Sequence, residues 1–147
     1  PIVMACMNMA KQKVGALIVI ERYVALNDVM QTGDTIDARI NQRLIENIFF
    51  KNSPLHDGAM VISKGRIKAA GCILPVSHNL DIPTELGLRH RAALGISQIS
   101  DAQAIIVSEE TGSISVAHEG KFYLHLTPEE LERILTKKEE SLIKKSE

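Results

Sequence analysis

The sequence predicts an α/β domain with a mixed central β-sheet of six or seven strands and helices on both faces. Two observations support this fold class. Short apolar or alternating runs that are typical of strands recur along the 147 residues, and they are interleaved with three amphipathic helical stripes. Apolar residues make up 45% of the chain but aromatic residues only 3%, so we expect an aliphatic core. No internal repeat or interdomain linker divides the chain, which predicts a single domain.

Charge and composition exclude several kinds of partner. A formal net charge of −1 gives no electrostatic basis for binding duplex nucleic acid, and two Tyr, three Phe and no Trp cannot supply the stacking platforms of a single-strand binder. Cys6 and Cys72 have no metal-type spacing, which indicates reduced thiols and a cytoplasmic domain. The longest apolar run, Val14 to Ile20, is far too short to span a bilayer. No signal peptide opens the chain, and Pro1 indicates a processed start or a piece of a longer protein.

The first part of the chain is predicted in three segments. Residues 1–13 carry some apolar side chains at helical spacing and are expected to form a short helix or a linker to an upstream region. Val14 to Glu21 is a compact β-branched run, typical of a buried strand. Asn27 to Asp37 is polar and rich in Asp, so we expect a loop there.

A helix, a hairpin and a second polar loop are expected next. The apolar side chains with helical spacing are Ile40, Leu44, Ile45, Ile48 and Phe49. This helix should end near Lys51, because Pro54 disfavours helical geometry at the residue before it. Ala59 to Ser63 and Arg66 to Leu74 are typical of two strands joined by a tight turn, and residues 77–84 are typical of a loop.

The remaining chain predicts another helix and three more strands. The second helical stripe consists of Leu88, Ala92, Gly95, Ile96 and Ile99. Ala102 to Val107 is typical of a buried strand. Ser113 to Ala117 and Lys121 to Leu126 alternate in polarity and predict a hairpin.

A capping box marks the start of the final helix. Thr127 has the N-cap position and Glu130 the third helical position, while Pro128 suits the first. The domain is therefore expected to cover residues 14–136, followed by a charged C-terminal tail at 137–147.

The first candidate for a site lies just before the predicted hairpin. His56 and Asp57 form an ionisable pair there, and Gly58 and Ala59 add almost no side chain, which would let a bulky ligand approach the backbone closely. An ordinary turn is the alternative, because Asp-Gly is also a strong hairpin signal. Residues 56–59 alone do not decide between a ligand site and a turn.

Two further segments could complete a site. Arg89, His90 and Arg91 stand at the start of a predicted helix, where free backbone N–H groups and the helix dipole favour an anion, and Arg adds a forked donor for phosphate oxygens. A solvated basic turn is the alternative. Glu109 and Glu110 follow a strand, where they could bind metal or form a polar turn. Because ligands of α/β sheets usually lie at strand ends and helix starts, one site could gather all three segments.

Together these motifs resemble the diadenylate cyclase domain family. Asp57-Gly58-Ala59 and, further along the chain, Arg89-His90-Arg91 match its two signature motifs in order and spacing. The surrounding Ser-Pro-Leu-His-Asp-Gly-Ala, Arg-His-Arg-Ala-Ala and Ser-Glu-Glu-Thr-Gly resemble the membrane-anchored CdaA/DacA-type branch. The resemblance extends from about Val14 to Leu135.

The resemblance implies an enzyme that condenses two ATP into cyclic di-AMP with release of two pyrophosphates. It implies a divalent metal, Mn²⁺, Mg²⁺ or Co²⁺, and a homodimer whose subunits face each other with one ATP each. Asp57 would act on the ribose 3′-hydroxyl, and Arg89, His90 and Arg91 would hold the phosphates. The residues implied to bind the nucleotide are Gly58, Ala59, Leu74, Leu88, Arg89 and Ser108, and the candidate metal ligands are His56 and Glu110.

Two positions depart from the family pattern. Relatives commonly have Thr where this chain has Leu88, so a hydroxyl contact to ATP is not expected there. Many have Tyr where it has Ile73, so aromatic packing on adenine is not expected either. Neither position carries charge, and activity is still expected, but both keep open a second class of function, a nucleotide-binding regulatory module without turnover. The resemblance also implies that the full-length parent is anchored to the membrane through an upstream segment.

Overall fold

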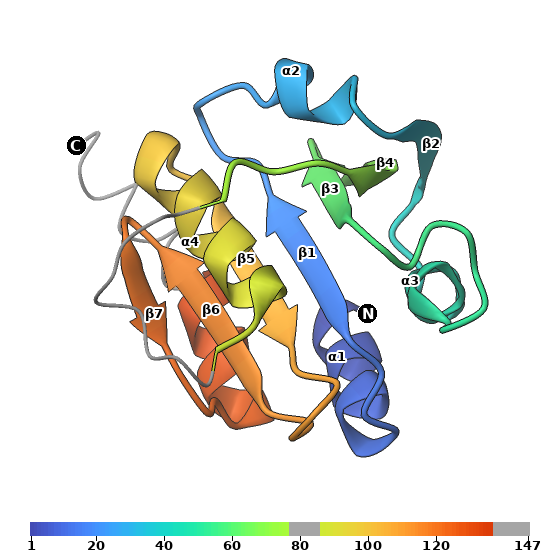
Figure 1. Cartoon of the computed structure of the whole chain (residues 1–147), viewed down its shortest axis with the longest axis vertical. Helices are drawn as coiled ribbons and strands as arrows, with labels where there is room; N and C mark the ends of the chain where they lie inside the picture. Colours follow the sequence, from blue (N-terminus) through green and yellow to red (C-terminus); the bar gives the residue numbers. More distant parts are fainter. Residues whose placement is uncertain (77–85, 137–147) are drawn as a thin grey trace.

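A seven-stranded mixed sheet forms the centre of the structure, a computed structural model that describes residues 1–76 and 86–136. The strand order is β2-β4-β3-β1-β5-β6-β7 (Figure 1). Strands β1 and β3 run parallel, and the other neighbouring pairs are antiparallel. The strands are β1 (Ala16–Ile20), β2 (Asp34–Arg39), β3 (Ala59–Ser63), β4 (Arg66–Cys72), β5 (Gln103–Val107), β6 (Ile114–His118) and β7 (Lys121–Tyr123). The predicted mixed sheet is confirmed.

Strand β1 lies in the middle of the sheet and is buried along its whole length. Ile18 is paired with Met60 of β3 on one side and with Ile105 of β5 on the other. Because side chains alternate along a strand, Ile18 joins the hydrophobic cluster on one face of the sheet, and Leu17 and Val19 join the cluster on the other. A strand covered on both faces is apolar throughout, which is the pattern that the sequence shows here.

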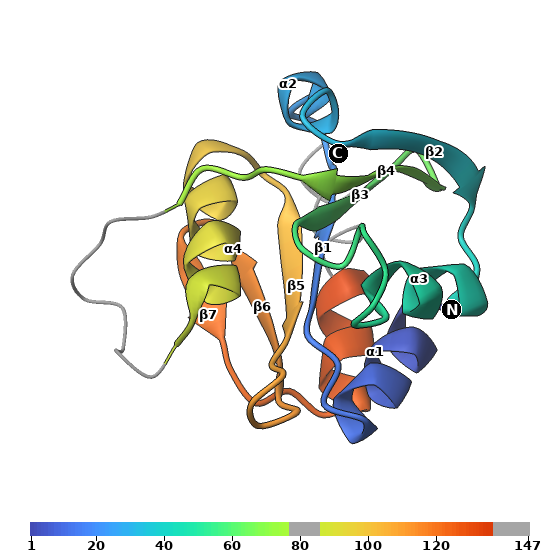
Figure 2. The same cartoon turned by 45° about the vertical axis from the view of Figure 1, so that its right-hand side comes forward.

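Helices cover both faces of the sheet, as the sequence predicts. On one face lie α1 (Ile2–Lys11), α3 (Gln42–Phe49) and the helix of residues 128–136, and on the other lies α4 (Leu88–Ile99) (Figure 2). Buried apolar side chains of these helices join the two hydrophobic clusters, one on each face of the sheet.

The prediction of a loop from Asn27 to Asp37 is wrong. This segment contains a short helix, α2 (Asn27–Met30), and the beginning of the edge strand β2, which pairs with β4 alone. The residues of β2 alternate only between exposed and half-buried, so the strand has little hydrophobic signal. A register shift also interrupts it and places Asp37 at a φ of 52°, where Arg66 holds the carboxylate at 2.9 Å.

Several boundaries differ from the prediction by a few residues. The helix expected from Ile40 begins at Gln42, because the side-chain oxygen of Asn41 caps it by accepting a backbone N–H at 3.2 Å. Strand β4 ends at Cys72 and strand β7 at Tyr123, both earlier than their apolar patterns suggest. The chain beyond them continues as an irregular segment that contributes to a cavity described below.

The predicted capping box is present. The hydroxyl oxygen of Thr127 accepts the Glu130 N–H at 3.1 Å, and the Glu130 carboxylate accepts the Thr127 N–H at 3.0 Å. The predicted loop at residues 77–84 and the tail at 137–147 lie outside the described residues. Within the described part of the chain, none of the helices combines the length and the apolar character needed to cross a membrane.

Candidate active site

A cavity of about 840 Å³ lies between the start of β3, the end of β4, the first turn of α4 and the turn that follows β5. It gathers most of the residues that the sequence assigns to a site. Those that line it are His56, Asp57, Gly58, Leu74, Leu88, Arg89, His90, Ser108 and Glu110. Ala59 is fully buried at the start of β3, and Arg91 is half-buried on α4, so these two lie outside its lining. A second cavity, of about 720 Å³ beside the C-terminal end of β1, holds none of them.

His56 and Asp57 place a ring nitrogen and a carboxylate oxygen side by side at the edge of the cavity. The Nδ1 atom of His56 is 2.8 Å from the carbonyl oxygen of Ser53, and since a carbonyl only accepts, Nδ1 carries the proton of the neutral ring. Its Nε2 atom then faces Asp57 Oδ1 at 3.5 Å. An imidazole nitrogen beside a carboxylate oxygen suits a divalent transition metal. Among the described residues, no group of three or more His, Cys, Asp or Glu side chains converges to hold a metal, so a ligand would have to supply the remaining donors.

Gly58 brings the entrance of β3 against the end of β4. Its φ of 118° is a conformation that other residues rarely adopt, and an added Cβ would lie 2.8 Å from the carbonyl carbon of Gly71. Gly71 itself has a φ of 66°. The absence of a side chain at Gly58 therefore lets the entrance of β3 pack against Gly71 next to Asp57, whose side chain remains 87% exposed and accessible from the cavity.

The first turn of α4 carries the basic triplet, as predicted, with Gly87 as the N-cap. Consecutive helical residues point in different directions, and the structure separates the three accordingly. Arg89 lines the cavity, and its Nη1 atom is 3.4 Å from Glu109 Oε1. His90 is buried, and Arg91 does not line the cavity.

His90 is an uncharged member of the triplet. It is 6% exposed, and its ring meets that of Phe122 edge to face at a centroid distance of 6.2 Å. Burial lowers the pKa of His90, and the electrostatic influence of Arg89 and His125 lowers it further. At neutral pH it can therefore donate a hydrogen bond but adds no positive charge.

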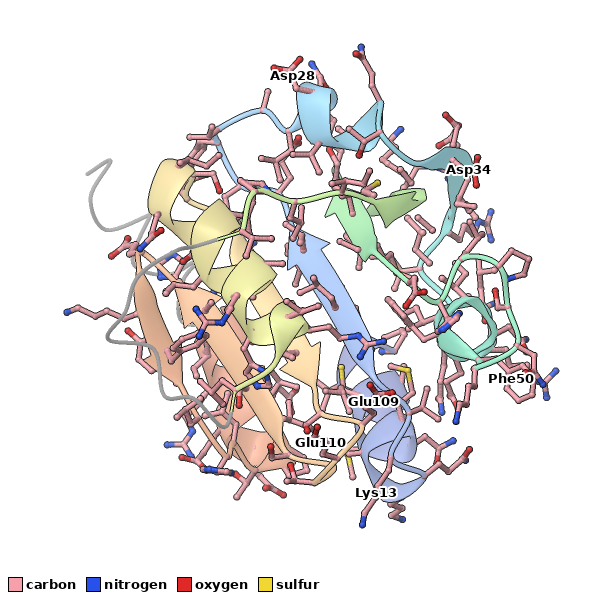
Figure 3. The ribbon with its side chains drawn as sticks, viewed as in Figure 1. Lys13, Asp28, Asp34, Phe50, Glu109 and Glu110 are labelled. Carbon is pink, nitrogen blue, oxygen red and sulfur yellow. The ribbon has the colours of Figure 1, made fainter. Side chains whose placement is uncertain are left out.

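The turn after β5 is held by the hydroxyl of Ser108. Its oxygen accepts the N–H groups of Glu110 and Thr111, each at 3.2 Å, so the hydroxyl still has a proton to donate. Gly112 closes the turn with a φ of 77°, and an added Cβ there would lie 2.6 Å from the carbonyl oxygen of Ala10. Glu109 and Glu110 thus lie where β5 ends, beside the C-terminal end of α1 (Figure 3).

Aliphatic side chains form the rest of the cavity wall and its rim. Leu74 is buried in the wall. At the rim, Ile73 is 70% and Leu88 77% exposed, and Val76 and Leu124 are also exposed. The N–H of Ile73 donates to Thr32 Oγ1 at 2.8 Å, which ties this part of the wall to the chain after α2. The cavity therefore has an apolar side as well as a charged one.

The charges of the cavity favour a ligand that brings cations with it. Among the described residues that line it, the carboxylates of Asp57, Glu109 and Glu110 outnumber the guanidinium of Arg89. A polyanion would be repelled by these carboxylates at close range. It could bind to Arg89 and the helix start if a cation offset the remaining negative charge.

Some cavity residues were not assigned by sequence reasoning. Ser113 and Ser115 line the cavity. They are two residues apart on a predicted strand and so share one face of it, which means that assigning one of them to the site would have predicted the other. Glu109 was predicted only as one of two acidic residues that could bind metal, and its ion pair with Arg89 was not predicted. His125 lies after β7 at a φ of 53°, and nothing in the local sequence distinguishes it.

Comparison with known proteins identifies the family. The model of the DAC domain, described as DisA bacterial checkpoint controller nucleotide-binding, matches residues 3–122. The chain is 48% identical over 127 residues to cyclic di-AMP synthase CdaA of Bacillus subtilis and 46% identical over 129 residues to a diadenylate cyclase of Listeria monocytogenes. These alignments cover 86% and 88% of this chain but 46% and 47% of the relatives. The chain thus spans about half the length of the curated relatives it matches.

Solved structures agree with this assignment. A double mutant of DacA from Staphylococcus aureus superposes with a TM-score of 0.91 at 46% identity, covering 92% of this chain and 91% of that one. A hypothetical membrane-spanning protein from Bacillus cereus superposes with a TM-score of 0.82 at 43% identity, covering 86% of this chain and 62% of that one. The same backbone and nearly half of the same residues are shared along most of the chain, which therefore belongs to the DAC domain family, in the branch of CdaA and DacA.

Proposed function

We propose that this domain is a diadenylate cyclase, which condenses two ATP into cyclic di-AMP and releases two pyrophosphates. The observation that carries the proposal is the meeting of Asp57 and Arg89, from the two motifs, in one cavity. In each half of the reaction, a ribose 3′-oxygen forms a bond to the α-phosphorus of the other ATP. The bond from that phosphorus to the oxygen bridging to the β-phosphate breaks, and the hydroxyl loses its proton.

Asp57 is the group that we assign to the 3′-hydroxyl. Its exposed carboxylate lies at the cavity edge, next to the close approach of Gly58 to Gly71. A carboxylate in that position can orient the hydroxyl or accept its proton as the new bond forms. In phosphoryl transfer, the protein contributes mainly by positioning the reactants and stabilising charge.

Arg89 and the start of α4 are assigned to the phosphates. The guanidinium offers a planar set of donors to phosphate oxygens, and the free N–H groups of the first helical turn add a partial positive charge. Neutral His90 would donate a hydrogen bond, and Arg91, outside the cavity lining, would act through its charge alone. Leu74 would pack on the adenine and Ser108 would donate to the nucleotide. Gly58 and Ala59 would let the nucleotide approach the backbone closely, and Leu88 would contact it.

A divalent metal fits the donor atoms of this cavity. His56 Nε2 and the Glu110 carboxylate are the protein groups that would hold it, and the excess of carboxylates favours a nucleotide that arrives with a cation. When bound, Mn²⁺, Mg²⁺ or Co²⁺ would neutralise charge on the phosphate chain and polarise it. The protein residues would then supply orientation.

We also propose that catalysis requires a homodimer whose two cavities face each other. One cavity holds one ATP, whereas the reaction joins two. The exposure of Asp57 and of the aliphatic rim formed by Ile73, Val76, Leu88 and Leu124 supports a second subunit over the cavity mouth. Apolar rims of this kind commonly mark protein interfaces.

Attachment of the parent protein to the membrane is a further part of the proposal. The similar Bacillus cereus structure is described as that of a membrane-spanning protein, and this chain spans about half of its curated relatives. We propose that an upstream segment provides the anchor and that this domain lies in the cytoplasm.

The test is an incubation of the purified domain with ATP and each metal separately, followed by chromatography for cyclic di-AMP and an assay for pyrophosphate. The two products should appear in the ratio of one to two. Binding of ATP without pyrophosphate release, at any protein concentration, would instead identify a regulatory nucleotide-binding module. The aliphatic residues Leu88 and Ile73 at the rim are the observation that favours that alternative.

A further inference from the structure

We propose that Gly15 is a positioning residue for Arg89, because the guanidinium occupies the space that a side chain at position 15 would need. Gly15 lies in the connection between α1 and β1, immediately before the strand and outside both motifs. The inference rests on the proposed function, since it concerns how the domain holds the phosphates of its nucleotide.

The contacts at this position involve the end of one side chain. A Cβ added to Gly15 would lie 2.6 Å from Nη1, 2.7 Å from Cζ and 3.1 Å from Nη2 of Arg89. All three distances are shorter than ordinary van der Waals contact, and two of them are too short for any real Cβ contact. Because the three nearest atoms all belong to the guanidinium, Arg89 is the group that a side chain here would displace.

The backbone at Gly15 gives no separate reason for a glycine. Unlike Gly58 and Gly71, Gly15 is not at a positive φ, so alanine could adopt its conformation without strain. Gly33 provides a contrast, because a Cβ there would clash with the backbone carbonyl oxygen of Ala70. The end of an arginine can rotate away, whereas the backbone of a paired strand cannot. Alanine at position 15 should therefore move Arg89 and leave the sheet intact.

Three segments meet at this guanidinium. The Arg89 side chain extends from α4, passes over Gly15 before β1, and reaches Glu109 after β5 at 3.4 Å. Only 22% of the side chain is exposed. An arginine confined in this way loses less freedom when it binds phosphate than one that is free in solvent. Gly15 thus increases affinity for the triphosphate without touching it.

The experiment compares wild type with Gly15→Ala by calorimetric titration. One ligand is 3′-deoxy-ATP, which lacks the reacting hydroxyl, and the other is adenosine, which lacks the phosphates. We expect Gly15→Ala to weaken 3′-deoxy-ATP binding about tenfold, through the loss of well-oriented charge-assisted hydrogen bonds. Adenosine binding and the unfolding temperature should not decrease. In an Arg89→Gln background, Gly15→Ala should cause no further loss, because both changes act through one group.

Several outcomes would overturn the proposal. Unchanged 3′-deoxy-ATP binding in Gly15→Ala would do so directly. Equal weakening of both ligands, a lower unfolding temperature, or a further loss in the Arg89→Gln background would show a distortion that reaches beyond Arg89. Gly33→Ala is the matched contrast and should lower the unfolding temperature. If the wild-type domain binds neither ligand, the proposed function fails as well. If the wild-type domain binds 3′-deoxy-ATP and Gly15→Ala binds it equally well, only the role of Gly15 fails.

Discussion

Asp57 and Arg89 have separable tasks in the proposed reaction, because one faces the hydroxyl and the other the phosphates. We predict that Asp57→Asn abolishes formation of cyclic di-AMP and leaves ATP binding nearly intact, since asparagine keeps the shape of the side chain but cannot take a proton. Chromatography of the products and calorimetry with ATP measure the two effects. Asp28→Asn, which changes an exposed carboxylate on α2 (Figure 3), should retain activity. Wild-type turnover in Asp57→Asn would refute the role of Asp57.

Glu109 competes with the triphosphate for Arg89 in the proposed site. The pair is 3.4 Å apart and the Glu109 side chain is 59% exposed, so the ion pair itself contributes little to stability. We predict that Glu109→Gln tightens ATP binding by about threefold at low salt, and that the gain shrinks as salt screens the charges. Titrations at two ionic strengths test this, with Glu129→Gln as a control of equal charge. Weaker binding of ATP in the presence of metal would mean that Glu109 helps to hold the metal instead.

His90 makes the stability of the domain depend on pH. Its pKa is lowered in the folded state, first by burial and then by Arg89 and His125, whereas in the unfolded chain histidine has its ordinary pKa of about 6.5. Below that pH the unfolded state binds more protons, so the free energy of unfolding falls with the pH until the folded-state pKa is passed. We predict a shallower fall in His90→Gln, measured by urea denaturation at pH values from about 7 to about 5. Equal slopes in the two proteins would contradict this.

At the scale of elements, the capping box determines how well the last helix is anchored. The reciprocal hydrogen bonds of Thr127 and Glu130 satisfy N–H groups that the helix cannot satisfy itself. We predict that Thr127→Ala lowers the free energy of unfolding by about 1 kcal/mol, measured by urea denaturation. Thr136→Ala, in the same helix but away from its start, should have a much smaller effect. A similar loss in both variants would argue against the cap.

The elements that the sequence predicts well are those whose burial is uniform or strictly periodic. Strand β1 is apolar at every position because both of its faces are covered, and α3 shows a helical stripe because it buries one side. Strand β2 and helix α2 were missed for the opposite reason. They lie at the edge of the sheet with little buried surface, and β2 gains its stability from pairing with β4, which no local pattern reveals.

The residues of the candidate site also differ in whether the sequence could predict them. Asp57 and Arg89 could be found from the sequence because each belongs to a short motif whose residues are adjacent. Gly15 could not, since its only distinguishing feature is a contact with Arg89 that exists once the sheet has formed. His125 likewise takes part in the cavity through a position that tertiary structure assigns.

At the scale of the whole molecule, the proposed reaction needs two copies of the domain. We predict that specific activity falls steeply when the protein is diluted through the dissociation constant of its dimer, because each subunit holds one of the two reacting ATP molecules. Activity assays over a dilution series, compared with sedimentation at the same concentrations, test this. A flat profile across concentrations at which sedimentation finds monomers would exclude a shared site.

The central position of β1 has a consequence for how this domain folds. The β3–β4, β5–β6 and β6–β7 pairs join neighbours in sequence, but Ile18 of β1 must find Met60 and Ile105. Pairing across such long loops is slow, because the entropy of closing each loop is lost before the contact forms. The cavity takes residues from β1, from before β3 and from after β5, so no hairpin contains it. Nucleotide binding therefore reports on completed folding, and in a refolding experiment it should recover together with the last phase of sheet formation.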